Sequence, residues 1–301
     1  VCASAGNHAQ GVALAAQLLG IKATVFMPIG APIPKFKATQ GYGATVHFHG
    51  VTIDEALIAA SDYAKETGAI FIHPFDHEDI VAGQATIGLE ILEQNPDVKT
   101  VVVCLGGGGL LAGAAMAIKE LRPDVKVIGV QAAEAAAYPA SLAAGSPQKL
   151  PKMATMADGI AVGRPGDIPF AMIQKYVDEV ITVSEESLAR TLLLTMERSK
   201  LIVEAAGIAA LTAILDNPSH FEGPVVATLS GGNIDPQLLN RVIRSGLSAA
   251  GRFMTLQVRL PDRPGALAEL LTVIGQAGAN IVEVSHTRIN PRLDIHDAVS
   301  Y

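Results

Sequence analysis

Apolar and β-branched residues fall into short runs that alternate with longer segments of helical periodicity over most of the chain. The runs that predict strands are residues 1–3, 23–27, 44–48, 70–73, 101–105, 125–130, 180–183 and 225–229. The segments that predict helices are residues 9–19, 35–40, 52–67, 80–94, 110–121, 187–200, 207–215 and 236–245. Because strands and helices alternate at this spacing, the pattern predicts an α/β fold whose parallel sheets are covered by helices on both faces.

A second pattern begins near residue 252. The small residues of 245–251 predict a linker. Residues 252–260 and 279–286 predict strands, and residues 266–277 predict a helix that follows a turn containing Pro and Gly. This order is typical of a small α+β domain. We therefore expect two domains, 1–247 and 252–301.

Both ends of the chain interrupt a pattern. Val1 opens inside a predicted strand, with a polar motif directly behind it. At the other end, one helix and little more than two strands cannot bury an apolar face by themselves. We therefore expect a fragment whose first lobe and second domain are both incomplete.

The clearest indication of a binding site lies in residues 100–113. There an apolar β-branched run leads into four consecutive glycines and then a Leu/Ala segment. This order predicts a buried strand, a bare turn and the first turn of a helix. Glycines leave main-chain N–H groups accessible, and a helix N-terminus favours an anion, most often a phosphate. We therefore interpret the glycine turn as the phosphate site of a cofactor.

Four other interpretations of this stretch stay open. Gly107 and Gly109 fit part of a dinucleotide fingerprint, although Gln131 ends the next strand where a carboxylate is expected. The spacing of Gly108 and Gly113 is that of a phosphate-binding P-loop, but no Lys follows. The uncharged run 100–118 is long enough for a membrane helix, although its glycines and valines favour a buried strand. A glycine-rich turn without a ligand is the fourth interpretation.

Two more polar or glycine-rich turns directly follow predicted strands, at residues 4–8 and 230–233. Ligands of parallel α/β sheets bind at the carboxyl ends of the strands. We therefore expect these two turns to meet the glycine turn at one cleft.

The composition narrows the class of partner. The formal net charge of −7 and the lack of a basic cluster argue against nucleic acid. Cys2 and Cys104 are the only cysteines of the chain, which is typical of a reducing, cytoplasmic location. No signal peptide or lipidation motif is visible, so we expect no membrane anchor.

Taken in order, Ser4-Ala5-Gly6-Asn7-His8, the glycine turn and Ser230-Gly231-Gly232-Asn233 resemble the motifs of the threonine/serine dehydratases. These are pyridoxal-phosphate (PLP) enzymes of fold type II, built from two open αβα lobes. Supporting motifs occur at residues 73–76, 82–88, 157–162 and 203–207. The tail from Arg252 resembles an ACT domain, an amino-acid-sensing module of ferredoxin-like fold, with its turn at residues 262–267.

The resemblance implies roles for individual residues. Asn7 would hydrogen-bond the phenolic oxygen of PLP, and Ser230 would meet its pyridine nitrogen. Glu204 would line the substrate pocket. The residues implied for the cofactor phosphate are Gly106, Gly107, Gly108, Gly109 and Leu110. The residues implied for the substrate carboxylate are Ser4, Ala5, Gly6 and His8.

The family's Schiff-base lysine lies in a Ser-Phe-Lys segment upstream of the Asn7 turn, which the chain does not contain. Phe36-Lys37 comes after that turn, and we interpret Lys37 as a solvated helix residue. The printed chain alone is therefore expected to be inactive. The parent reaction implied is deamination of L-threonine, or of L-serine, to a 2-oxo acid and ammonia.

Several alternatives accompany this hypothesis. Within the family they are serine dehydration and racemisation. Outside it they are a nicotinamide-dependent oxidoreductase and a non-catalytic amino-acid-binding module. The resemblance also implies a homo-oligomer and an amino-acid effector at the ACT domain.

We expect no metal centre. His73, Asp76, His77 and Glu78 imitate a metal cluster, with His47 and His49 nearby in the sequence, but Pro74 disfavours the helix that such ligands need. Some relatives hold a cation after the strand that follows the glycine turn. Here residues 131–137 carry a single carboxylate, so that site is not expected.

Overall fold

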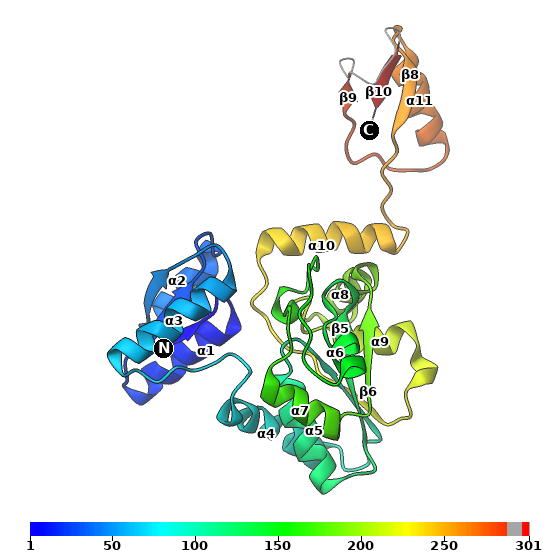
Figure 1. The fold of residues 1–301 in the computed structure, drawn as a ribbon. Helices are drawn as coiled ribbons and strands as arrows, with labels where there is room; N and C mark the ends of the chain where they lie inside the picture. The colour runs from blue at the N-terminus through cyan, green and yellow to red at the C-terminus, as the bar shows by residue number, and fades with distance from the viewer. Residues whose placement is uncertain (288–296, 301) are drawn as a thin grey trace. The chain divides into compact units, whose positions relative to one another are not determined.

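The computed structural model describes residues 1–287 and 297–300, which divide into two compact units, 1–249 and 250–301 (Figure 1). Each unit is described by itself. The first unit contains two parallel sheets, and the second unit contains one antiparallel sheet.

The first sheet has the strand order β1-β2-β3 and is flanked by three helices. Its strands are β1 (Cys2–Ala3), β2 (Thr24–Met27) and β3 (Thr45–Phe48). Its helices are α1 (Asn7–Leu19), α2 (Ile33–Gly41) and α3 (Ile53–Thr67). Side chains alternate along β2, so Val25 and Met27 pack with α1 while Phe26 packs against α3 on the other face.

The second sheet has the order β6-β5-β4-β7, with every neighbouring pair parallel. Its strands are β4 (Thr100–Cys104), β5 (Lys126–Ala132), β6 (Glu179–Val183) and β7 (Val225–Ala227). Its α-helices are α4 (Glu78–Gln94), α5 (Gly109–Leu121), α6 (Tyr138–Ala144), α7 (Asp167–Tyr176), α8 (Glu185–Ser199), α9 (Ala209–Asp216) and α10 (Pro236–Ala249). Short 3-10 helices are η1 (Ala133–Ala135), η2 (Asp158–Ile160) and η3 (Pro218–His220).

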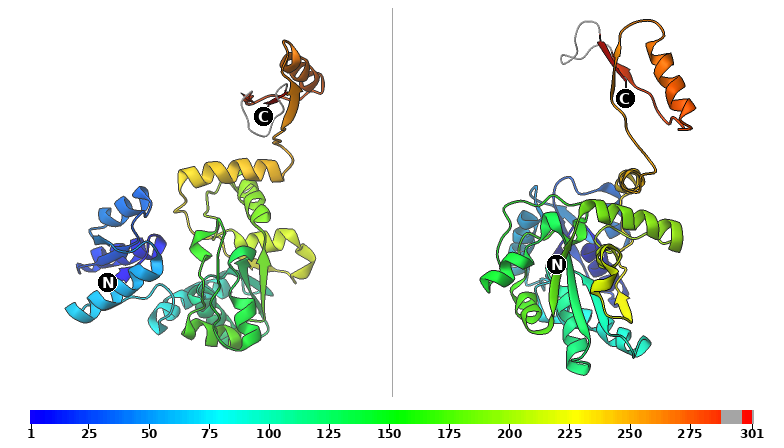
Figure 2. Two further views of the ribbon diagram at one scale, coloured as in Figure 1. Left: turned by 45° about the horizontal axis from the view of Figure 1, so that its top comes forward. Right: turned by 90° about the vertical axis from the view of Figure 1, so that its right-hand side faces the viewer.

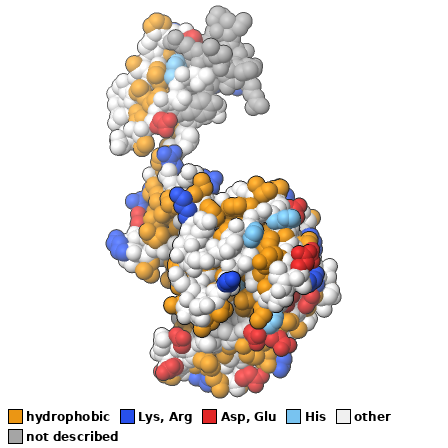
Figure 3. All heavy atoms as spheres, turned by 90° about the vertical axis from the view of Figure 1, so that its left-hand side faces the viewer, with side chains coloured by type: hydrophobic (Ala, Val, Ile, Leu, Met, Phe, Trp, Pro, Cys, Tyr) orange, Lys and Arg blue, Asp and Glu red, His pale blue; other side chains and the backbone are white. Residues whose placement is uncertain are grey.

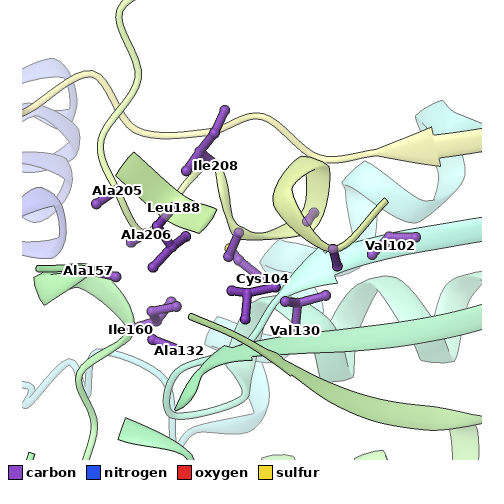
Figure 4. Close-up of a cluster of buried hydrophobic side chains, with 14 of the residues drawn as sticks. Val102, Cys104, Val130, Ala132, Ala157, Ile160, Leu188, Ala205, Ala206 and Ile208 are labelled. Carbon is purple, nitrogen blue, oxygen red and sulfur yellow. The ribbon is translucent and has the colours of Figure 1, made fainter. Parts of the chain in front are cut away.

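Helices cover both faces of the second sheet (Figure 2). Alternation of side chains along β4 builds two cores, one on each face. Val102 and Cys104 face the cluster that contains Leu188 of α8 and residues of α9 (Figure 4). Val101 and Val103 face the cluster formed with α4, α5 and α7. All five residues of β4 are buried, as expected for a central parallel strand.

The second unit is an antiparallel sheet of order β8-β10-β9 with one helix. Its elements are β8 (Val258–Pro261), α11 (Ala266–Gln276), β9 (His286–Thr287) and β10 (Asp297–Ser300). This arrangement agrees with the predicted α+β domain.

The predicted strand at residues 70–73 is wrong. Within the described residues, the backbone-to-backbone hydrogen bonds of this segment join it to Val1 alone: the N–H of Ile72 donates to the carbonyl of Val1, and the amino group of Val1 donates to the carbonyl of Ile70. Two bonds to one residue do not make a ladder. In the second unit, the strand predicted at 252–260 is confirmed only from Val258, where β8 begins. The strand predicted at 279–286 is wrong except at His286, where β9 begins.

Most predicted helices differ from the observed ones by one or two residues at an end, and two larger differences stand out. Helix α10 continues to Ala249, so most of the predicted linker is helical. Helices α6 and α7 were not predicted. Each is short and has a proline in its first turn. A proline usually indicates a turn in a sequence, but it is tolerated in the first turn of a helix.

The long uncharged run that resembled a membrane helix is the strand β4, the glycine turn and the helix α5. Among the described residues, no helix combines the length and the apolar character that crossing a bilayer requires. Figure 3 shows hydrophobic side chains exposed across one face, with acidic and basic side chains spread between them.

Two leucines of α5 test the packing of the second sheet. Leu111 is fully buried, whereas Leu121 is 60% exposed. We expect Leu111→Ala to lower the free energy of unfolding by about 2–5 kcal/mol, because a cavity is left behind. The matched control Leu121→Ala should change it by about 0.5 kcal/mol or less. Urea titrations measure both, and equal losses would contradict this packing.

Candidate active site

The glycine turn joins the buried strand β4 to the helix α5, which begins at Gly109. Gly108 precedes the helix with φ of +107°, a backbone conformation that residues other than glycine rarely adopt. Its carbonyl accepts the N–H of Ala112 at 2.8 Å, which closes the first helical turn. Glycine is therefore required at position 108 by the backbone itself.

The main-chain N–H groups of this turn have no acceptor among the residues that the structure describes. Within residues 1–287 and 297–300, no backbone hydrogen bond is donated by Gly106, Gly107 or Gly108. The macrodipole of α5 adds partial positive charge at the same place. Unpaired N–H donors in a largely buried turn are costly unless a ligand accepts from them. The turn thus has the chemistry of an anion site.

The space beside the glycines is filled by protein. A methyl group built on Gly106 would lie 2.9 Å from Cα of Ile160. On Gly107 it would lie 2.5 Å from the ring of Phe75. Here the missing side chains allow close packing, and only the N–H groups remain available.

Asn7 and Glu204 are joined directly, although they lie far apart in the sequence. The Asn7 side chain donates from Nδ2 to Oε1 of Glu204 at 2.7 Å. Glu204 is only 8% exposed. Burial and the nearby Asp158 raise the pKa of Glu204, and the hydrogen bond from Asn7 and the charge of Lys35 offset this only in part. Glu204 therefore holds the Asn7 amide in place at the start of α1.

Ser230 follows the end of β7 and contacts Cys104 at the end of β4. Burial raises the pKa of the Cys104 thiol to about 11, and a side-chain hydrogen bond with Ser230 opposes this shift. Such a thiol is unreactive at neutral pH. The N–H of Glu204 donates to the carbonyl of Gly231 at 2.8 Å, which ties this turn to the Asn7–Glu204 pair.

The three turns come together around η2. A methyl group on Gly159 of η2 would lie 3.4 Å from Oε1 of Glu204, and one on Gly106 would lie 3.4 Å from the carbonyl oxygen of Gly159. An ion pair of 3.0 Å between Lys35 of α2 and Asp158 of η2 adds a second link between the two sheets. The predicted convergence of the three turns is thus present in the structure.

The remaining residues of the first turn are partly engaged. The N–H of Gly6 donates to Oγ of Ser4 at 3.0 Å, so these two groups satisfy each other. Nε2 of His8 lies 3.1 Å from the carbonyl oxygen of Ile72, and burial lowers the pKa of His8. Ala5, like Ser4 and His8, is only partly buried.

The histidine-rich stretch has structural roles. Nδ1 of His73 accepts from the N–H of Asp76 at 2.8 Å, and Nδ1 of His77 accepts from the N–H of Asp79 at 3.2 Å. The carboxylate of Asp76 accepts from Asp167 and Ile168 at the N-terminus of α7. In the described part of the chain, no three His, Cys, Asp or Glu side chains are placed to hold a metal ion.

The sequence did not reveal the residues behind the glycine turn. Tyr138 donates from its hydroxyl to the carbonyl of Gly107 at 3.2 Å, and Phe75 covers the turn from another side. Both act over long sequence separations. The only local signal was Pro139, which marks the first turn of α6.

Comparisons with known proteins identify the class. The model of the pyridoxal-phosphate dependent enzymes matches residues 1–231, and the model of the ACT domain matches residues 254–299. The chain belongs to this family of pyridoxal-phosphate dependent enzymes. The dinucleotide and P-loop interpretations of the glycine turn are therefore set aside.

Individual relatives narrow the class further. The chain is 47% identical over 288 residues to an L-threonine ammonia-lyase of Thermotoga maritima, which covers 96% of the chain and 72% of that relative. A threonine deaminase isoform of Solanum lycopersicum has a similar structure, with a TM-score of 0.78, 36% identity, and coverage of 81% of this chain and 73% of that one. A maize serine racemase has a TM-score of 0.76 and 32% identity, with coverage of 83% and 78%.

The raised pKa of Glu204 has a consequence for stability. A carboxyl group whose pKa is higher in the folded than in the unfolded state makes the protein less stable as pH rises from its ordinary value of 4.5 through the raised value. Glu204→Gln keeps an acceptor for Asn7 but does not titrate. We therefore expect the free energy of unfolding of the variant to rise relative to wild type as pH increases above 4.5.

Urea titrations at a series of pH values measure this difference, with Glu93→Gln on the exposed side of α4 as the control. The control should run parallel to wild type. If Glu204→Gln also runs parallel, Glu204 does not hold its proton more tightly in the folded protein.

Proposed function

We propose that this chain is part of an L-threonine ammonia-lyase, which converts L-threonine to 2-oxobutanoate and ammonia. The observation that carries the proposal is the set of unpaired N–H groups at Gly106, Gly107 and Gly108, beside the turns of Asn7 and Ser230. Two relatives named L-threonine ammonia-lyase, 47% and 48% identical to this chain, support the choice of substrate. We propose the domain limits 1–247 for the catalytic part and 252–301 for the ACT part.

The residues present fit pyridoxal 5'-phosphate. We assign the phosphate to the N–H groups of Gly106, Gly107, Gly108, Gly109 and Leu110, because these donors lie at the positive end of α5. When bound, PLP supplies an electron sink for the negative charge that develops at the α-carbon of the substrate.

The other two turns act on the two sides of the ring. Asn7 has a second N–H on Nδ2, besides the one that Glu204 accepts, and we assign it to the phenolic oxygen of the cofactor. We assign Ser230 to the pyridine nitrogen, which its hydroxyl would meet when the cofactor is bound. A hydroxyl, unlike a carboxylate, does not hold that nitrogen protonated, which moderates the electron sink and suits elimination of the β-hydroxyl.

The start of α1 is assigned to the substrate carboxylate. Ser4 shapes this turn by accepting from Gly6, and the N–H groups of Ala5 and His8 make no backbone hydrogen bond within the described residues. These donors and the macrodipole of α1 favour a carboxylate over a neutral group. Glu204, buried behind Asn7, positions that amide and lies at the edge of the same pocket.

Serine chemistry is the second candidate. The structural similarity to a maize serine racemase favours it, because one arrangement of turns serves threonine and serine alike. L-serine would give pyruvate by elimination and D-serine by racemisation, so product analysis with both amino acids separates the candidates.

We further propose that the ACT unit binds an amino-acid effector, that the protein assembles as a homo-oligomer and that it works in the cytoplasm. The match of the ACT model to residues 254–299 supports the effector. Cys2 and Cys104 are both free and buried, which suits a reducing compartment.

Activity of the full-length protein tests the proposed function. Loaded with PLP, it should release 2-oxobutanoate from L-threonine, detected with a coupled dehydrogenase. Asn7→Ala should lower kcat/KM by about 10- to 100-fold, since one hydrogen bond to a charged oxygen contributes about 1.5–3 kcal/mol. Gln17→Ala, on the exposed side of the same helix, is the matched control and should match wild type.

Two results would count against this assignment. One is a PLP-loaded protein that forms no 2-oxobutanoate from L-threonine. The other is an Asn7→Ala variant as active as the control, which would remove Asn7 from the site while leaving the reaction in place.

A further inference from the structure

The carbonyl of Gly107 is held from behind the glycine turn by two donors. The hydroxyl of Tyr138 donates to it at 3.2 Å, and the N–H of Gly166 donates to it at 3.1 Å. Tyr138 is the first residue of α6, and Gly166 directly precedes α7. No other carbonyl of the four glycines accepts a side-chain hydrogen bond within the described residues.

The direction of this carbonyl fixes the direction of one N–H. The peptide bond between Gly107 and Gly108 is trans, so the carbonyl of Gly107 and the N–H of Gly108 point in opposite directions. Holding the carbonyl toward Tyr138 therefore turns the Gly108 N–H away from Tyr138. On that side no protein group accepts it in the described residues.

We propose that Tyr138 is a positioning residue of the phosphate site: its hydroxyl orients the Gly107–Gly108 peptide so that the Gly108 N–H donates to the cofactor phosphate. This inference rests on the proposed function, because it requires a phosphate at the glycine turn. It explains why the Gly108 N–H points in one direction. The glycines alone do not explain this, since glycine allows its peptide group to turn either way.

The contacts of Tyr138 fix the position of its side chain. Its side chain is fully buried, and its ring packs against Phe170 with centroids 6.2 Å apart. Its own N–H donates to Oε1 of the fully buried Gln131 at 2.9 Å, which fixes the start of α6. Burial raises the pKa of the Tyr138 hydroxyl well above its ordinary value, so it remains a donor at every working pH.

The second donor to the carbonyl has its own support. Gly166 precedes α7, and Asp76 accepts from Asp167 and Ile168 at 3.0 and 2.9 Å. Gly166 lies directly against that carboxyl group. The hydrogen bond from Gly166 remains when the Tyr138 hydroxyl is removed. We therefore expect the Gly107–Gly108 peptide to become less well oriented rather than to reverse its direction.

Tyr138→Phe in the full-length protein tests the inference, because it removes the hydroxyl and keeps the ring. We expect the Kd for PLP to rise about fivefold, as for the loss of one hydrogen bond of ordinary strength. The Kd for pyridoxal, which lacks the phosphate, should change less than twofold. The 31P resonance of bound PLP should also shift, which a merely structural role would not require.

Tyr176→Phe is the matched control. The hydroxyl of Tyr176, at the end of α7, donates to Glu120 at 2.7 Å and accepts from Lys175 at 2.7 Å. This variant therefore also loses the hydrogen bonds of a phenol, but none of them involves the glycine turn. It should leave both Kd values and the 31P resonance unchanged. If Tyr138→Phe fails to fold, Gln131→Met, which removes the acceptor that fixes Tyr138, takes its place with the same expected selectivity.

The outcomes separate the two proposals. A wild-type protein that binds pyridoxal as tightly as PLP would overturn the phosphate site and the proposed function with it. A wild-type protein that prefers PLP, with a Tyr138→Phe variant of equal preference and unchanged 31P resonance, overturns the role of Tyr138 alone. Equal weakening of PLP and pyridoxal in the variant also overturns it, because the effect would then not pass through the phosphate.

Discussion

The site depends on main-chain N–H groups at the positive end of α5 that have no acceptor in the described part of the chain. A buried strand, β4, delivers the chain to this place, and the positive φ of Gly108 lets the turn enter the helix at once. Tyr138 and Gly166 donate hydrogen bonds to the Gly107 carbonyl, which turns the Gly108 N–H away from Tyr138. N–H donors without an acceptor in a buried turn are energetically unfavourable, and this is a cost in folding free energy. An anion with several acceptor oxygens removes that cost.

Glu204 is the second centre of the arrangement, and it links the parts that the sequence keeps apart. Its carboxyl accepts from Asn7, its N–H donates to Gly231, and it lies beside Gly159 of η2. Burial of a carboxyl group in this position is unfavourable for its charged form. The position is therefore explained by what Glu204 holds in place rather than by its own stability.

Much of the fold and of the candidate site could be predicted, because the sequence patterns that specify them lie within short segments of the chain. A β-branched run before four glycines and a Leu/Ala segment specifies β4, the turn and α5, and the order of the three turns carried the family resemblance. Contacts between distant segments were not predictable. Asn7 meets Glu204 across 197 positions, and Asp76 reaches α7 across 91. The sequence also did not show that Ile160 and Phe75 lie so close to Gly106 and Gly107 that a larger side chain there would clash with them.

A crystal structure of the full-length protein with PLP bound tests the central claim most directly. The account predicts phosphate oxygens within about 2.7–3.2 Å of the main-chain nitrogens of Gly106 to Gly109, with Asn7 and Ser230 on the two sides of the ring. A phosphate bound elsewhere, with the N–H groups of the glycine turn still lacking an acceptor, would contradict it.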